Sequence, residues 1–348
     1  MNVNDYKEYY FDLAKKIFGT PSPTGYTCEI MPIIKKYAEE NGATFTQTGN
    51  GAGIITYKGK NSDKALGLSA HTDTLGLMVR SVLPDGKIKF TKIGGIQLAT
   101  VDGEYCTVIT RKGKRYSGTV LSTSPSSHVY DDADKKREEP SMYVRLDQEV
   151  KSDKDVYALG IDNGDYIAID PKTTVTENGF LKSRFIDDKA SVCDLLTVLK
   201  IMKDYGYTPE YDVKMLISVF EEVGHGASFV PDNLISMLAV DMGCVGSDLK
   251  CDEYKVSICA KDSNGPYSYD LTNRLITLAE QNGIDFAVDV YPHYGSDVGA
   301  MWQAGNDVKG ALIGQGVHAS HGMERTHFKG IANTVKLILC YLGFTDVK

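Results

Sequence analysis

The chain alternates between apolar runs of strand length and longer stretches in which apolar residues recur at helical intervals. Helical spacing predicts helices at 11–18, 28–41, 189–205, 270–282 and 329–342. Apolar runs predict strands at 53–57, 65–69, 213–220, 238–240, 255–260, 286–291 and 310–313. Because strands and helices alternate, the sequence predicts an α/β fold whose mostly parallel sheet is covered by helices on both faces.

The pattern changes between residues 79 and 176. Short β-type runs at 87–91, 105–110, 117–121, 143–146 and 166–169 are separated by turn signals such as Pro84-Asp85-Gly86, and no long helical pattern interrupts them. We therefore expect a small β-domain (79–179) inserted into one α/β domain made of residues 1–78 and 180–348. The charged segment 131–139 is expected to be a solvated loop.

Composition narrows the classes of partner and compartment. The net charge of −8 disfavours nucleic acid as the main partner, because phosphate binding needs a basic surface. No apolar stretch approaches the ~20 residues that cross a bilayer, and the first residues do not read as a signal peptide. The seven cysteines include no CxxC pair, which favours a cytoplasmic location.

Three predicted strands each lead into residues that commonly bind metals. The run 65–69 precedes His71 and Asp73, the run 213–220 precedes Glu221 and Glu222, and the run 238–240 precedes Asp241. In open α/β sheets, ligands bind beyond the carboxyl ends of the strands. These side chains are therefore expected to converge on one site.

The residue types suit a pair of metal ions. Two ions ~3.5–4 Å apart activate water and polarise a carbonyl, which is what amide hydrolysis at neutral pH requires. The pair Asp187-Asp188 can supply a bridging carboxylate, and the segment 318–324 supplies a late histidine. Glu221 is expected to be a free general base, because neighbours in a strand point to opposite sides. Asp73 is expected to orient His71.

The segments that carry these residues resemble the tetrahedral (TET-type) metalloaminopeptidases, also catalogued as deblocking or glutamyl aminopeptidases and formerly as endoglucanases. The resemblance extends in order and spacing over most of the chain. It rests on the segments 69–73 with 76–79, 185–189, 221–224, 240–243, 295–297 and 320–325.

The resemblance implies five ligands for two divalent ions: His71, Asp187, Glu222, Asp241 and His321. Asp187 would bridge the ions, Glu221 would be the base, and Asp73 would support the ligands. Zinc is the first candidate metal, although cobalt and manganese accept the same ligand types. The family's fold is a phosphorylase/hydrolase-like zinc-peptidase sheet with an inserted PDZ-like β-domain. Its members act on small peptides and commonly build tetrahedral dodecamers, so a homo-oligomer is expected.

Two departures from the family pattern leave choices open. Lys189 stands where the family often has arginine, and we assign it no role. Glu324 follows His321 by three residues where the family has four, so His318 stays an alternative to the preferred His321.

Other residues and other functions also stay open. His225 could contact substrate, although a structural role in the turn is the preferred interpretation. The resemblance implies that His128 could reach the active site, and Asp297 could either line the pocket or cap a turn. Other functions that we weigh are a di-metal deacylase acting on a non-peptide amide, a glycoside hydrolase, and a binding protein with a vestigial metal site.

Overall fold

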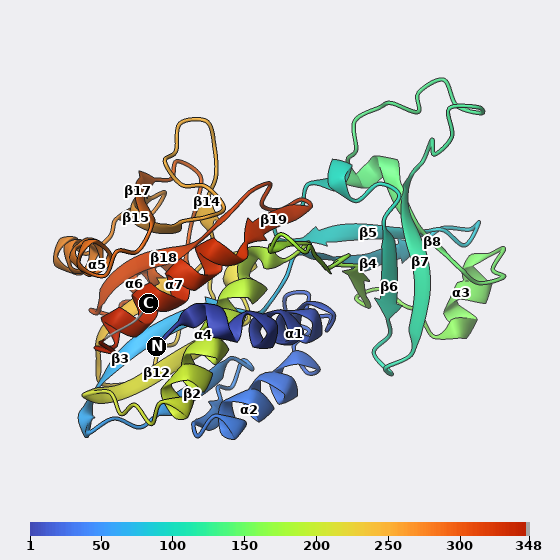
Figure 1. Ribbon diagram of the computed structural model, residues 1–348. Helices are drawn as coiled ribbons and strands as arrows, with labels where there is room; N and C mark the ends of the chain where they lie inside the picture. The colour runs from blue at the N-terminus through green and yellow to red at the C-terminus, as the bar shows by residue number, and fades with distance from the viewer. Residues whose placement is uncertain (346–348) are drawn as a thin grey trace.

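The computed structural model describes residues 1–345, which form an α/β body with a smaller β-barrel beside it (Figure 1). Each part has its own hydrophobic core, one between the main sheet and its helices and one inside the barrel. The α/β fold with an inserted β-domain is therefore confirmed.

The main sheet of the described chain contains ten strands. In spatial order they are β1 (Thr44–Gln47), β2 (Gly53–Tyr57), β12 (Tyr211–Ser218), β3 (Asn61–His71), β13 (Leu234–Val240), β18 (Lys309–Val317), β15 (Val256–Asp262) and β16 (Gly265–Pro266), with β14 (Gly243–Cys244) beside β18 and β17 (Phe286–Val290) beside β15.

The sheet is mixed. The central strands β12, β3, β13 and β18 run parallel, whereas β2 is antiparallel to β12 and β15 is antiparallel to β18. The prediction of a mostly parallel sheet is thus right for the central strands, while the flanks combine antiparallel pairs with the parallel pair β15–β17. Central β3 shows why: its residues 65–71 are all buried, as expected for a strand covered on both faces.

Helices cover both faces of the sheet. The α-helices are α1 (Lys7–Phe18), α2 (Ile30–Glu40), α3 (Asp153–Leu159), α4 (Ile186–Asp204), α5 (Tyr269–Gln281), α6 (Asp297–Gln303) and α7 (Phe328–Tyr341). On β18, Gln315 bonds to Ser191 of α4, whereas Gly310 packs against Val298 of α6. Because side chains alternate along a strand, these odd and even positions place α4 and α6 on opposite faces.

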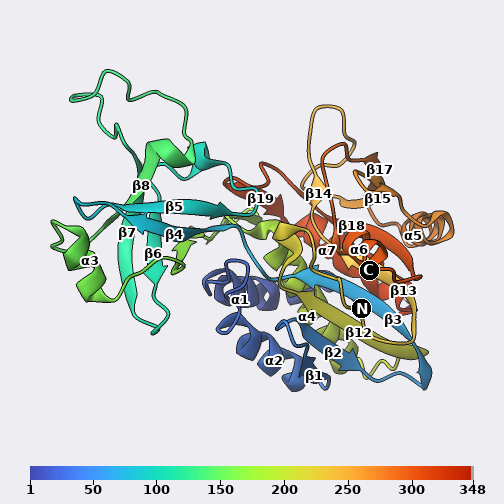
Figure 2. The same ribbon diagram turned by 180° about the vertical axis from the view of Figure 1, so that it is seen from behind.

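The inserted domain is a closed antiparallel barrel. Its strands, in order around the barrel, are β4 (Gly76–Val82), β5 (Ile88–Ile93), β8 (Met142–Leu146), β7 (Arg115–Ser122), β6 (Tyr105–Ile109) and β9 (Tyr166–Ile169). Strand β4 and the short helix α3 were not expected from the sequence. The long loop between β7 and β8 projects away from the body and includes the charged segment, which is largely exposed (Figure 2).

A small sheet joins the end of the insert to the α/β body. It contains β10 (Thr174–Val175), β11 (Phe180–Ser183) and β19 (Glu324–His327). Short 3₁₀ helices complete the fold: η1 (Val3–Tyr6), η2 (Leu98–Thr100), η3 (Glu139–Ser141) and η4 (Glu221–Val223). The domain boundaries at 79 and 179 stay predictions. No helix among the described residues is both long and apolar enough for a bilayer crossing.

Candidate metal centre

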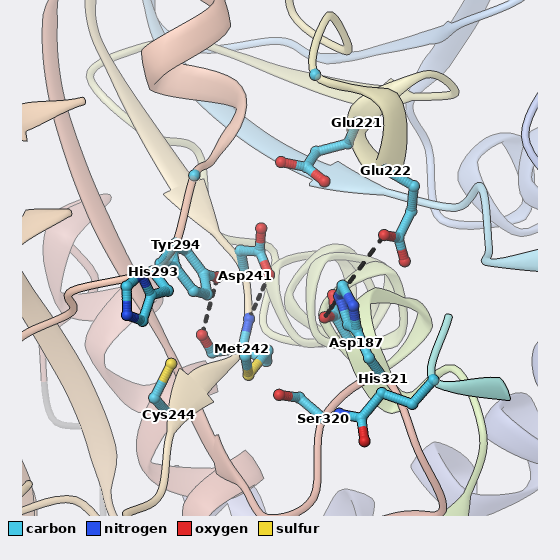
Figure 3. Close-up of a pocket in the computed structure, with 13 residues that line it drawn as sticks. Asp187, Glu221, Glu222, Asp241, Met242, Cys244, His293, Tyr294, Ser320 and His321 are labelled. Carbon is cyan, nitrogen blue, oxygen red and sulfur yellow. Dashed lines mark hydrogen bonds and ion pairs between the residues drawn. The ribbon is translucent and has the colours of Figure 1, made fainter. Parts of the chain in front are cut away.

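The candidate ligands meet where the parallel strands β3, β12 and β13 end. His71 is the last residue of β3, and Asp241 directly follows β13. Glu221 and Glu222 lie in the 3₁₀ turn η4, because β12 already ends at Ser218. Strand alternation therefore does not explain how these two glutamates differ, contrary to the expectation from sequence. Figure 3 shows their carboxylates reaching into the pocket in different directions.

Asp73 holds this glutamate turn in place. Its two carboxylate oxygens accept hydrogen bonds from the backbone N–H groups of Glu221 (3.2 Å) and Glu222 (3.3 Å), and from the Thr24 hydroxyl (2.7 Å). The bond to His71 instead involves the backbone carbonyl of Asp73, 3.0 Å from Nδ1. Asp73 therefore supports the site in two ways without facing the pocket.

Asp187 lies between the two histidines. Its Oδ1 is 3.1 Å from His71 Nε2, and its Oδ2 is 3.5 Å from His321 Nε2. Although α4 formally begins at Ile186, Asp187 and Asp188 have non-helical backbone angles and are joined by a cis peptide bond. A carboxylate whose two oxygens face different ligands is arranged as a bridging ligand would be.

In both histidines Nδ1 faces a backbone carbonyl and Nε2 faces the Asp187 carboxylate, at 3.1 Å in His71 and 3.5 Å in His321. His71 Nδ1 donates to the Asp73 carbonyl, and His321 Nδ1 donates to the Gly95 carbonyl at 3.3 Å. A carbonyl can only accept, so in the neutral ring the proton lies on Nδ1 and the lone pair on Nε2. A metal-binding histidine is typically oriented by such a bond from its other nitrogen.

The structure brings His321, not His318, to this cluster. His321 Nε2 is 3.7 Å from Glu222 Oε2, whereas His318 is exposed and pairs with Arg325 through the backbone. Glu324 holds both segments in place, because its carboxylate accepts hydrogen bonds from the backbone N–H groups of Asp187 (3.0 Å) and His321 (2.9 Å). Sequence reasoning noted Glu324 only for its position and missed this positioning role.

The residues present fit divalent cations. Among the described residues, nothing donates a hydrogen bond to the buried oxygens Glu222 Oε1 and Asp188 Oδ1. Buried carboxylate oxygens without a partner are costly, and a cation removes that cost. Two sets offer ligand atoms within 4.8 Å of one another: His71 with Asp187 and Glu222, and His71 with Asp188 and Asp241. Asp188 therefore joins the candidates, although the resemblance assigned it no role.

Crowded carboxylates perturb one another's protonation. Burial, followed by the nearby charge of Asp187, raises the pKa of Asp241 to about 7 and that of Glu324 to about 8. Burial would also raise the pKa of Asp187, but hydrogen bonds from His321 and His71 outweigh it and hold that pKa low. Burial and the charge of Asp241 raise the pKa of Glu221 well above its ordinary value. Such a concentration of negative groups is typical of a functional site.

The cluster opens into a cleft of about 430 Å³ (Figure 3). The cleft is lined by Gln97, Asp187, Glu221, Glu222, Gly224, Asp241, Met242, Cys244, His293, Tyr294, Gly295, Ser320 and His321. Gln97, Cys244, His293 and Tyr294 were not singled out as site residues from the sequence. They come from loops and a two-residue strand, where no periodic pattern marks them.

The remaining candidates do not line the cleft. His225 is exposed and stacks on Phe220 at 5.1 Å between ring centres, and His128 is exposed in the long barrel loop. Asp297 is buried behind the glutamate turn and accepts from the Ser218 hydroxyl at 2.9 Å. The buried Lys189 amine donates to the Thr20 carbonyl at 2.6 Å.

Comparison with known proteins identifies the family. The model of the M42 glutamyl aminopeptidase family matches residues 51–337. The chain belongs to this family. It is 42% identical over 333 residues to the protein named Putative aminopeptidase YhfE of Bacillus subtilis (strain 168), covering 95% of this chain and 96% of that protein.

Solved structures of similar fold agree. A TET aminopeptidase from a marine sediment archaeon of the Thaumarchaeota superposes with a TM-score of 0.87 at 22% identity, covering 97% of this chain and 98% of that one. The TET1 peptidase of Pyrococcus horikoshii superposes with a TM-score of 0.84 at 24% identity, covering 96% and 99%. The chain is therefore a peptidase of the M42 family, a hydrolase, and this metallopeptidase family implies the use of a divalent metal.

Proposed function

We propose that this M42 peptidase is an aminopeptidase that removes N-terminal residues from small peptides with two divalent ions. His71 and Asp241 would hold one ion, and Glu222 and His321 would hold the other. Asp187 would contribute to the binding of both ions. The observation that carries this proposal is the position of Asp187, whose two carboxylate oxygens each face the Nε2 atom of a different histidine. Two such ions would lower the pKa of a water and polarise the scissile carbonyl.

Glu221 is the general base in this proposal. Its Oε2 lies 3.7 Å from His71 Nε2, and its carboxylate points into the cleft from a turn fixed by Asp73. It would take the proton of the attacking water and pass that proton to the leaving amine. In the metal-free site, burial and the charge of Asp241 raise the pKa of Glu221 well above its ordinary value. Two bound cations would lower that pKa again, so that the carboxylate could accept the proton of the water.

Zinc is the first candidate ion, with cobalt and manganese as alternatives that tolerate the same nitrogen and oxygen ligands. We also propose a homo-oligomer in the cytoplasm, with a tetrahedral dodecamer as the specific expectation. The Pyrococcus horikoshii relative supports this, since it is described as assembling into a tetrahedron or a large octahedral shell. Light scattering should then give a mass twelve times that of the 38.1 kDa chain.

Metal removal and replacement test the proposed reaction. Chelated protein should lose hydrolysis of aminoacyl p-nitroanilides, and zinc, cobalt or manganese should restore it with two ions bound per chain. N-acetylated substrates should not be cleaved. Faster cleavage of the acetylated amide would point to the deacylase alternative, and unchanged activity after verified metal removal would refute the metal mechanism.

A further inference from the structure

The cleft has one side without charged groups next to the ligand cluster. Figure 3 shows Tyr294 and Cys244 across the cleft from Glu221 and Glu222, with Asp241 between. We call Met242, Cys244 and Tyr294 the neutral wall. All three side chains pack against the main hydrophobic core, and Met242 is only 3% exposed.

The neutral wall offers few hydrogen-bond donors to a ligand. The Tyr294 hydroxyl already donates to the Met242 carbonyl at 2.9 Å, and its ring packs against Tyr291. Cys244 carries a thiol, a weak donor, and burial raises its pKa so that it stays neutral. Met242 contributes a thioether. Such a surface suits an apolar or thioether side chain better than a charged one.

Beyond the neutral wall, histidines are the only described cleft-lining residues with a basic side chain that could pair with an acidic substrate residue. Of the described residues that line the cleft, none is lysine or arginine, and four are carboxylates. His293 is exposed at the rim. An acidic first residue would therefore meet like charges, while the carboxylates that could attract a basic one are the proposed metal ligands.

We propose that the neutral wall receives the side chain of the substrate's N-terminal residue and selects uncharged apolar residues such as leucine and methionine. This inference rests on the proposed aminopeptidase function. The carbonyl of that residue must reach the ligand cluster, while the rest of the peptide leaves toward solvent. The side chain of the substrate's N-terminal residue then occupies the part of the cleft beside Asp241, next to the buried neutral wall. The substrate class thus differs from the one in the family's name, M42 glutamyl aminopeptidase.

The test compares kcat/KM for the p-nitroanilides of leucine, methionine, glutamate and lysine, using the full-length metal-loaded protein. We expect the leucine and methionine substrates to exceed the glutamate and lysine substrates by at least about tenfold. A glutamate or lysine substrate that equals or exceeds leucine would overturn the proposal and leave the aminopeptidase function intact. Cleavage of none of the four by protein with bound metal would instead remove the proposed function itself.

A substitution locates the selectivity on the wall. Cys244→Arg should lower the ratio of leucine to glutamate activity by at least about tenfold, because a guanidinium would pair with the substrate carboxylate. Cys28→Arg, the same change at an exposed cysteine that does not line the cleft, should leave the ratio unchanged. Cys244→Phe, which adds bulk without charge, should impair leucine more than alanine substrates. A folded Cys244→Phe variant with an unchanged leucine-to-alanine ratio would place the side chain elsewhere and overturn the assignment.

Discussion

We propose that single side chains divide the work of the site between holding ions and moving a proton. Asp187 and the two histidines have the geometry of ligands, whereas Glu221 approaches from a separate turn. Conservative substitutions can therefore separate metal binding from proton transfer.

For Glu221→Gln we expect unchanged metal content and a kcat lower by about 10²–10⁴-fold, the usual contribution of a general base. The amide keeps the shape of the side chain but cannot accept the water's proton. Metal analysis and steady-state kinetics measure the two effects separately. The matched control is Glu280→Gln, the same substitution at an exposed position of α5. Wild-type turnover in the Glu221 variant would rule out the base assignment.

The two late histidines make a second comparison. His321→Ala should lose at least one ion and most activity, because His321 Nε2 faces both Asp187 and Glu222. His318→Ala should keep both ions, since His318 is exposed. Isothermal titration with zinc distinguishes the two variants, and the opposite pattern would make His318 the ligand.

Among the secondary-structure elements, the segments that follow the strand ends orient the proposed metal ligands. Glu324, the first residue of β19, holds the backbone of both Asp187 and His321. Glu324→Gln exchanges one acceptor oxygen for a donor, so one of these N–H groups loses its partner. We expect zinc affinity to fall about 10–100-fold, as is usual when a group that orients a ligand is changed. Competition with a chromogenic chelator measures the affinity, and an unchanged value would show that Glu324 does not orient the site.

Arg184 joins the barrel to the α/β body. It is 2% exposed, donates to the carbonyls of Thr100 (2.5 Å) and Gly322 (3.3 Å), and lies 3.5 Å from Glu104. Arg184→Ala should lower the free energy of unfolding by about 1–3 kcal/mol, because the carbonyls of Thr100 and Gly322 lose a buried donor while Glu104 keeps its ion pair with Lys172. Thermal unfolding should show this loss, while Arg80→Ala at an exposed position should not. Equal melting temperatures for the Arg184 and Arg80 variants would show that Arg184 does not stabilise the contact between the barrel and the α/β body.

Elements with a clear period were predictable from the sequence, and loops were not. The apolar period revealed α4 and the central strands, and the ligands at the ends of β3 and β13 followed from strand topology. The turn η4 broke the alternation on which the role of Glu221 had been argued. The positions of Glu324, Cys244 and Tyr294 depend on contacts between distant segments, which no local pattern encodes.

For the molecule as a whole, we expect metal binding at this site to be coupled to the stability of the fold. In metal-free protein, pKa values of about 6 for Asp297, about 7 for Asp241 and about 8 for Glu324 lie above the ordinary carboxyl range near 4. The folded state then favours the protonated form of these carboxyls. Their contribution to the free energy of unfolding is therefore fully present below about pH 4 and is lost as pH rises to about 8. The pKa of His321 is about 9, so its contribution to stability is also lost as pH rises from about 6.5 to 9.

We therefore expect the melting temperature in EDTA to fall between pH 5 and pH 8. With zinc the fall should be smaller or reversed, because ions bind the deprotonated ligands and stabilise the folded state. Asp297→Asn removes one of these titrating groups and should flatten the slope in EDTA. A melting temperature in EDTA that rises over this range would contradict the account of the buried carboxylates.

The most direct test of the central claim is a crystal structure of zinc-loaded protein with anomalous data at the zinc absorption edge. We expect two anomalous peaks in the cleft, one beside His71 and Asp241 and one beside Glu222 and His321, with Asp187 contacting both. Peaks remote from these side chains, or only one fully occupied peak under saturating zinc, would contradict the central claim.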